Sequence, residues 1–254
     1  MPVSCPTPAG KATPRSVWKA ALSALRAADT STYRVQSETA LPEGHLTLSR
    51  SAKVDAPRRQ GEFSGSVAIQ EGGKSPTKDT VTVVVDGDEA FLQAASWTGD
   101  RKGRWMRLTE ASSEEAGIPF DVTFDTLPAE LVDFVPHGVK EQYGSTWVSG
   151  RIPARAALSA LGLGHLLLKD RALADSVSGT VGAAARLSNN GCLEYIEVLG
   201  NTSRVKGSST KVPADVLEGL VRSSYARIFI SSVGTPQTIV VPPADSLIDP
   251  GPRA

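Results

Sequence analysis

The stretch that decides the fold is PRSVWKAALSALRAADTSTYRVQSET, residues 14–39. Its first half carries one apolar stripe at helical spacing, made of Trp18, Ala21, Leu22, Leu25 and Ala28. Pro14 suits the first turn of a helix, where its missing N–H costs nothing. Tyr33 and Val35 then alternate with polar neighbours, as in a half-buried strand. The sequence therefore predicts a helix over 14–28 that runs almost directly into a strand over 32–39.

Further alternating segments follow as far as Leu108. Val81, Val83 and Val85 share one face of a β-branched run that ends at Asp86-Gly87-Asp88, a favourable hairpin turn. Strands at roughly 8–12-residue spacing indicate an antiparallel sheet rather than βαβ units. We therefore expect an α+β fold, with a strongly curved antiparallel β-sheet built as a meander and helices covering its concave face.

The middle of the chain changes character. Residues 120–135 are rich in apolar side chains, and Leu127, Leu131 and Phe134 fit a short helix opened by Pro128. We interpret this segment as a helical flap with an apolar underside.

The later segments resume regular patterns. Residues 138–150 resemble one strand, and 153–169 a helix that Gly162 and Gly164 should break or fray. The clearest hairpin joins 176–187 to 192–199 through Asn189-Asn190-Gly191. A helical turn over 212–220 and a strand over 226–233 complete the pattern.

Composition excludes several functional classes. Lysine plus arginine number 27, as do aspartate plus glutamate, and this zero net charge disfavours a nucleic-acid binder. No apolar stretch reaches the roughly 18–20 residues that span a bilayer. Residues 1–13 resemble a flexible tether, and residues 14–250 are expected to form a single domain.

Cys5 follows a small residue in Val3-Ser4-Cys5-Pro6, a pattern that resembles the end of a bacterial lipoprotein signal. The alternative is an ordinary cysteine in a disordered leader. A disulfide with Cys192, the only other cysteine, is disfavoured because residues 1–13 are not expected to be ordered.

Catalytic and metal-binding signatures are missing from the sequence. No G-x-S-x-G setting for a nucleophilic serine occurs. His45, His137 and His165 show no i, i+4 pairing with another metal ligand. Gly72-Gly73-Lys74-Ser75 lacks the preceding glycine of a phosphate-binding loop. We expect no enzyme activity, no metal and no cofactor.

Several elements together resemble a known family. They are the Trp18 helix leading into residues 28–35, the valine strand 81–85 with its Phe91 hairpin, the segment 103–108, the strand 143–150, and the turn and strand 190–196. In this order they resemble actinobacterial cell-envelope lipoproteins of the LppX/LprG type, which share a LolA-like half-barrel. The resemblance covers roughly residues 14–250.

The resemblance implies a lipid or glycolipid ligand in an apolar cavity and a membrane anchor through a lipidated N-terminal cysteine, here Cys5. It implies a location at the cell envelope, on the outer face of the cytoplasmic membrane, or secretion, and we expect a monomer. Apolar positions on the predicted inner strand faces and the flap are the candidate cavity lining: Phe63, Ile69, Val83, Val85, Leu127, Leu131 and Phe134. Ordinary core packing is the alternative role for these residues. The rival function is an envelope sensor or protein-interaction module with a filled core and no lipid cargo.

Overall fold

The structure is a computed structural model that describes residues 13–41, 44–71, 77–94, 103–109 and 133–248. Its strands are β1 (Thr30–Leu41), β2 (Gly44–Asp55), β3 (Gln60–Glu71), β4 (Thr77–Asp86), β5 (Glu89–Ala94), β6 (Trp105–Leu108), β7 (Val135–Gln142), β8 (Ser145–Pro153), β9 (Ser178–Leu187), β10 (Leu193–Lys206), β11 (Ser224–Ser231) and β12 (Leu247–Ile248). The helices of eight or more residues are α1 (Pro14–Arg26) and α8 (Ala214–Arg222). Shorter ones are α5 (Ala154–Ala160), α6 (Gly164–Lys169), α7 (Arg171–Ser176) and the single turn η1 (Ala244–Ser246).

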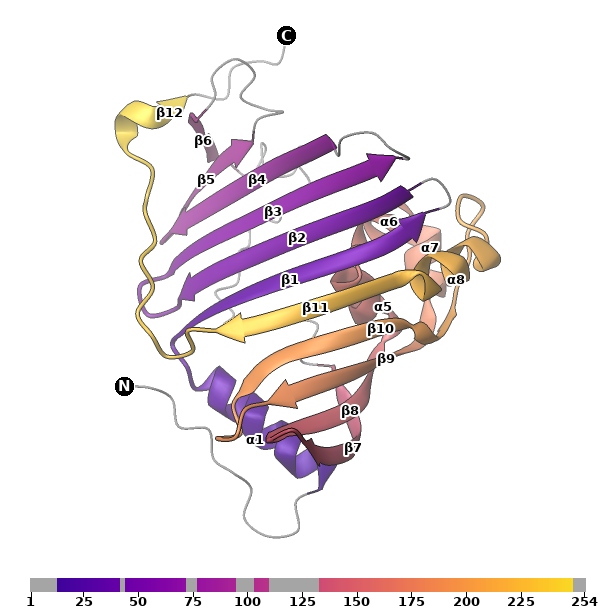
Figure 1. The fold of residues 1–254 in the computed structure, drawn as a ribbon. Coiled ribbons are helices and arrows are strands. Elements are labelled where there is room, and N and C mark those ends of the chain that lie inside the picture. Colours follow the sequence, from indigo (N-terminus) through magenta and orange to yellow (C-terminus); the bar gives the residue numbers. More distant parts are fainter. Residues whose placement is uncertain (1–12, 42–43, 72–76, 95–102, 110–132, 249–254) are drawn as a thin grey trace.

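These twelve strands form one open, curled sheet in the order β12-β6-β5-β4-β3-β2-β1-β11-β10-β9-β8-β7 (Figure 1). From β1 to β6 the chain steps outward strand by strand. From β7 to β11 it returns from the opposite edge to the centre, where β11 pairs with β1. The sheet is therefore two antiparallel meanders joined by one central pairing.

The C-terminal segment links the two meanders a second time. After β11 it passes along the strand ends to β12, which pairs in parallel with β6 at Trp105 and Met106 (Figure 1). On the way, Gln237 is buried and accepts a hydrogen bond from the Thr32 hydroxyl at 3.0 Å. The segment after β11, the last strand of the second meander, thereby connects to β6 at the far edge of the first meander.

Helix α1 begins as the sequence predicts. Thr13 caps it, with its hydroxyl oxygen accepting from the Ser16 amide at 3.2 Å, and Pro14 occupies the first turn. Its apolar stripe is buried against β7, β8 and β10. There the Trp18 ring contacts Phe134, with ring centroids 4.4 Å apart. The helix thus packs on the second meander, although the first meander follows it in the chain.

A glycine break brings the helical layer across to the first meander. Gly162 separates α5 from α6 and has φ +80°, a conformation that L-residues with side chains rarely adopt. A Cβ there would lie 2.1 Å from Leu48 Cδ1 and 2.7 Å from Ser37 Oγ. Both the conformation and this close approach require glycine, so the predicted helix over 153–169 is interrupted where it meets β1 and β2.

Two expectations need correction. Residues 138–150 belong to two strands, β7 and β8, which meet at a tight turn where Tyr143 and Gly144 have φ of 53° and 71°. Two consecutive positive φ values are typical of the turn that best joins twisted strands, but tyrosine seldom signals it. Helix α7 was not predicted. Of the expected flap at residues 120–135, residues 120–132 lie outside the described residues, and Val135 begins β7.

Substitution of Trp18 tests the packing of α1. The indole N–H is buried and has no hydrogen-bond acceptor in the described part of the chain, and an unpaired buried donor is destabilising. Trp18→Phe removes this donor together with part of the ring. Removal of the unpaired donor stabilises the fold, and loss of ring contacts destabilises it. We expect the two effects to offset, so that the unfolding free energy changes by less than about 1 kcal/mol. Trp18→Ala should lower it by about 3–5 kcal/mol. Urea unfolding measures both; an equal large loss in the two variants would contradict this packing.

Candidate functional site

The sheet has two chemically different faces, which the strand register defines. Val35 pairs with Ile228, Ile228 with Ile196, Ile196 with Ala185, and Ala185 with Val148. Directly paired residues of neighbouring strands point to the same side. All of them are buried in the core cluster that contains the helix residues Trp18 and Leu158. We call this helix-bearing side the inner face and the opposite side the outer face.

The inner face carries two separate hydrophobic clusters. The larger one lies mainly between β7–β11 and the helices α1, α5, α7 and α8. The smaller one is formed on β4, β5 and β6 by Val83, Val85, Ala90, Leu92 and Leu108, with Phe63, Val81 and Met106 packed beside them. Inner-face residues of β2 and β3 lie between the two clusters.

On β2 and β3 the inner face is only partly covered. Leu46 pairs with Ile69 and Leu48 with Val67; we call these four residues the inner strip. Ile69 is 44% exposed and Val67 38% exposed, and both leucines are half-buried. By contrast, Val35 on the neighbouring β1 is 3% exposed. The strip is therefore an accessible apolar surface within an otherwise covered face.

Glycines show how differently the two halves of the inner face are filled. A Cβ on Gly150 of β8 would lie 2.4 Å from the Phe134 ring and 2.6 Å from the Val135 carbonyl oxygen. A Cβ on Gly65 of β3 would have no described atom within 4 Å. The β8 position is closely packed, whereas no described residue fills the space over Gly65 of β3 beside the inner strip.

One cation sits next to this space. Arg50 pairs with both Val35 and Gly65, which places it at an inner-face position of β2. It is exposed, and Nη2 donates to the Ser159 carbonyl oxygen of α5 at 3.1 Å. Among the inner-face positions that the register assigns to β1–β6, Arg50 is the one basic residue.

The predicted lining residues do not all come together. Phe63 pairs with Val83, and these two residues lie with Val85 in or beside the smaller cluster. Ile69 is in the inner strip, on the same face. Phe134 belongs to the larger cluster. Leu127 and Leu131 lie outside the described residues. That these side chains line one cavity remains a prediction.

Sequence reasoning missed Leu46, Leu48 and Arg50 as site residues. The signal was present, because the alternation of Leu46 and Leu48 extends to position 50 on the same face.

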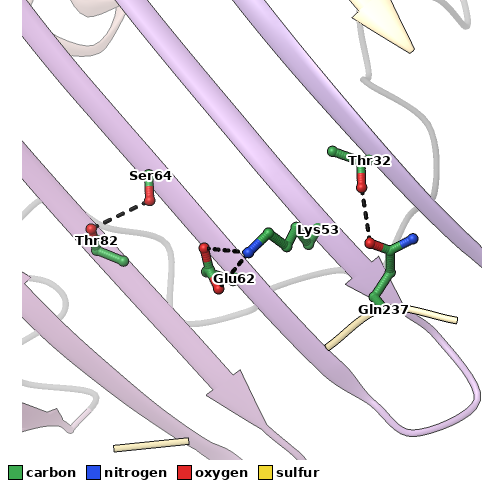
Figure 2. A network of polar contacts seen from close by, with 6 residues as sticks. All are labelled: Thr32, Lys53, Glu62, Ser64, Thr82 and Gln237. Atoms are coloured by element: carbon green, nitrogen blue, oxygen red, sulfur yellow. Dashed lines mark hydrogen bonds and ion pairs between the residues drawn. The ribbon is translucent and has the colours of Figure 1, made fainter. Parts of the chain in front are cut away.

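Polar pairs lie on part of the outer face of the first meander, whereas Val84 and Phe91 on the same face are buried. Figure 2 shows Lys53 donating to both carboxylate oxygens of Glu62, each at 3.0 Å, and Ser64 bonded to Thr82 at 3.3 Å. Both pairs join residues directly opposite each other on neighbouring strands. Partly exposed cross-strand pairs of this kind contribute little individually, but they give this side a polar surface.

Aromatic and charged residues alternate on the outer face of the second meander. Tyr195 lies 5.7 Å from Trp147 and 5.9 Å from Phe229 between ring centroids, and the Arg186 guanidinium lies over its ring. Tyr225 donates to Glu197 at 2.9 Å. Burial, together with this bond to a carboxylate, raises the pKa of Tyr225 to about 12. These contacts connect neighbouring strands of the second meander on the outer face.

The cysteines give a further correction. Cys192 is disulfide-bonded, and the sequence contains only one other cysteine, Cys5, which lies outside the described residues. A structural disulfide at Cys192, which the sequence disfavours without excluding, is therefore present.

Three findings concern metal ligands and membrane spans. Among the described residues, no group of three or more His, Cys, Asp and Glu side chains is arranged to hold a metal ion. His45 lies 3.4 Å from Glu38 between Nδ1 and Oε1. No helix in the described ranges has the length and apolar character needed to cross a bilayer.

Comparison with known proteins adds a likeness of fold. No family model and no curated protein matches this chain. Among solved structures, LprF from Mycobacterium bovis is 12% identical, with 90% of this chain and 96% of that chain covered and a TM-score of 0.49. The lipoprotein LppX from Mycobacterium tuberculosis is 11% identical, with 89% and 98% covered and a TM-score of 0.41. LppX is one of the proteins after which the family type noted in the sequence is named. At these identities and scores the likeness assigns no ligand or activity to this chain.

Proposed function

We propose that this protein is a non-enzymatic cell-envelope lipoprotein that binds or carries a lipid or glycolipid on the inner face of its sheet. The observation that carries the proposal is the inner strip, with Ile69 and Val67 exposed by 44% and 38% on the face that also bears both hydrophobic clusters. An apolar surface left accessible on an inner, helix-bearing face is a feature of binding surfaces rather than of ordinary packing.

Burial of acyl chains supplies the affinity in this proposal. Each CH₂ group transferred from water to an apolar surface contributes about 0.8 kcal/mol, and no directional contact is needed. The strip adjoins Phe63 and Val81 at the edge of the smaller cluster. A chain lying along β2 and β3 would therefore contact apolar side chains from the strip to the cluster.

The proposal includes a membrane anchor. Residues 1–13 form the tether, residues 14–250 form a single lipid-binding domain, and a lipid on Cys5 holds the monomeric protein at the outer face of the cytoplasmic membrane. Cys5 is the only other cysteine of the chain, and one sulfur cannot form both a thioether and a disulfide. An anchored monomer would therefore lack the disulfide at Cys192.

A second candidate function rests on the packed half of the inner face. Around Gly150, the Phe134 ring and the Val135 carbonyl leave no room for even a methyl group, and Leu158, Ile196 and Ile228 are fully buried. If the whole inner face behaves like this half, the protein is an envelope sensor or interaction module without lipid cargo.

Native mass spectrometry of the protein purified from a lipid-containing host, with organic extraction of bound material, distinguishes the two functions. A stoichiometric lipid that leaves on extraction is expected. A clean apo mass that added phospholipid or glycolipid does not change would contradict lipid binding and favour the interaction module.

Paired substitutions on β3 locate the binding surface. Val67→Gln with Ile69→Gln makes the strip polar and should weaken lipid binding by about tenfold or more, since about 2 kcal/mol of apolar contact is lost. Ala68→Gln is the matched control, because Ala68 lies between these residues but pairs with Thr47 and Lys78 on the outer face. Lipid titration followed by native mass spectrometry measures both; equal affinities would exclude the strip.

Intact-mass analysis of the protein produced from its full gene in its native host tests the anchor. We expect a diacylglycerol-type mass increase on the peptide that begins at Cys5, which is lost in Cys5→Ser. A Cys5–Cys192 linked peptide that reduction releases, without a lipid-modified species, would contradict lipidation.

A further inference from the structure

The turn between β9 and β10 places an asparagine directly before a glycine. The chain contains three asparagines, Asn189, Asn190 and Asn201, and only Asn190 precedes a glycine. Glycine has no side chain to shield its backbone nitrogen. Attack by that nitrogen on the side-chain carbonyl carbon of the preceding asparagine is the first step of deamidation. Asn190 is exposed, so water has access to it.

The native turn does not align the two reacting atoms. The Gly191 N–H donates to the Ser188 carbonyl oxygen at 2.9 Å, which closes a four-residue turn. Asn189 and Asn190 have negative φ and Gly191 has φ +76°. The turn is therefore of type I, in which the ψ angle of Asn190 is about 0°. At that angle the Gly191 nitrogen is eclipsed with the Asn190 backbone nitrogen, whereas ring closure requires it to be eclipsed with Cβ.

Ser188 holds the same turn through its side chain. Its hydroxyl donates to Oδ1 of Asn190 and accepts from the Cys192 N–H at 3.2 Å. Its backbone N–H donates to the Cys192 carbonyl oxygen at 2.8 Å. The side-chain amide of Asn190 is thus fixed within the turn, and the rotation that ring closure needs requires these bonds to open.

We propose that Asn190 is a deamidation site whose reaction is restricted to the opened turn, with Ser188 as the positioning residue. In the open turn the Gly191 nitrogen, having lost its proton to solvent, forms a bond to Cγ of Asn190. The Cγ–Nδ2 bond breaks, and Nδ2 takes up a proton and leaves as ammonia. Water then adds to either carbonyl carbon of the succinimide and gives aspartate or isoaspartate. The reaction is independent of lipid binding.

Both products change the hairpin. Each adds a negative charge, and isoaspartate also adds one CH₂ group to the backbone of the turn. The bonds that Ser188 and Gly191 make then no longer match the lengthened chain. Leu187 and Leu193, which pair directly beside the turn, are buried, so the distortion reaches the core. We expect the converted protein to melt at a lower temperature than fresh protein.

Incubation of the full chain in heavy-oxygen water at mildly alkaline pH, followed by peptide mapping, tests the site. Base favours loss of the Gly191 amide proton, and the heavy oxygen marks hydrolysis that occurs during incubation. We expect labelled aspartate and isoaspartate at Asn190, with Asn189 and Asn201 unchanged over the same period. The chain unfolded in urea, with its disulfide intact, should convert at least about tenfold faster because the turn is open.

One variant and a matched control test the role of Ser188. Ser188→Ala removes the hydroxyl bonds and keeps the Asn190–Gly191 pair, so we expect it to convert about threefold to tenfold faster than wild type. Ser64→Ala removes another half-buried serine hydroxyl, which bonds to Thr82 on the outer face of β3, and should keep the wild-type rate. Thermal melts verify that both variants are folded.

Each contrary result removes a defined part of the proposal. If folded wild type converts as fast as the urea-unfolded chain, the turn does not restrict the reaction. If folded Ser188→Ala reacts at the wild-type rate or more slowly, the hydroxyl does not hold the amide in place. Aspartate without isoaspartate would mean direct hydrolysis instead of a succinimide. If both folded proteins stay unconverted after the urea-unfolded chain has reacted, Asn190 is not a modification site of the native protein.

Discussion

The central pairing of β1 with β11 is the interaction on which the remaining structure depends. Thr32 to Thr39 of β1 lie opposite Ser231 to Ser224 of β11 in unbroken antiparallel register. Each meander could close its own hairpins without this contact, but only the pairing makes their inner faces one continuous surface. It also fixes which side chains face the helices, because a shift of one residue would turn either Val35 or Ile228 to the outer face.

The two meanders use their shared inner face differently. Under α1 and α5 it is filled to the backbone, with small residues such as Gly150 and Ala185 allowing aromatic and aliphatic side chains to approach closely. Over Leu46–Arg50 of β2 and Val67–Ile69 of β3 the same face remains partly accessible, whereas Ala52 and Val54 of β2 are buried. A protein that needed only a stable core would gain by covering Ile69 and Val67. The asymmetry therefore separates a supporting half from a half available to a ligand.

Much of the local structure could be predicted from the sequence because its periods are clear. The Trp18 stripe and Pro14 predicted α1, and the alternations at 81–85 and 193–199 predicted strands that are found. The β7–β8 hairpin was missed because Tyr143, not glycine or asparagine, takes the first left-handed position of its turn. The pairing of β1 with β11 has no local signal, since it depends on residues far apart in the chain.

The candidate site was predictable only in part for a related reason. Alternation places Ile69 and Val83 on the same face, yet Val83 is 8% exposed and Ile69 44%. Period-two patterns state which side a residue faces but not what covers it, and coverage depends on helices from distant parts of the sequence. The space over Gly65 likewise becomes visible only in three dimensions.

The position of α1 has a consequence for the order in which the chain folds. This helix is made before any strand, but it packs on β7, β8 and β10 of the later meander. The edge of β1 that pairs with β11 also stays unpaired for a long time, because β11 is among the last strands to be made. Contacts between such distant segments form slowly, because a long loop must lose entropy by closing before the favourable contacts are made. A chain emerging N-terminus first therefore carries an unsupported amphipathic helix and a bare strand edge until nearly all of it is available. Segments of this kind associate with other chains if left exposed, so α1 and β1 need protection until β7–β11 have been made.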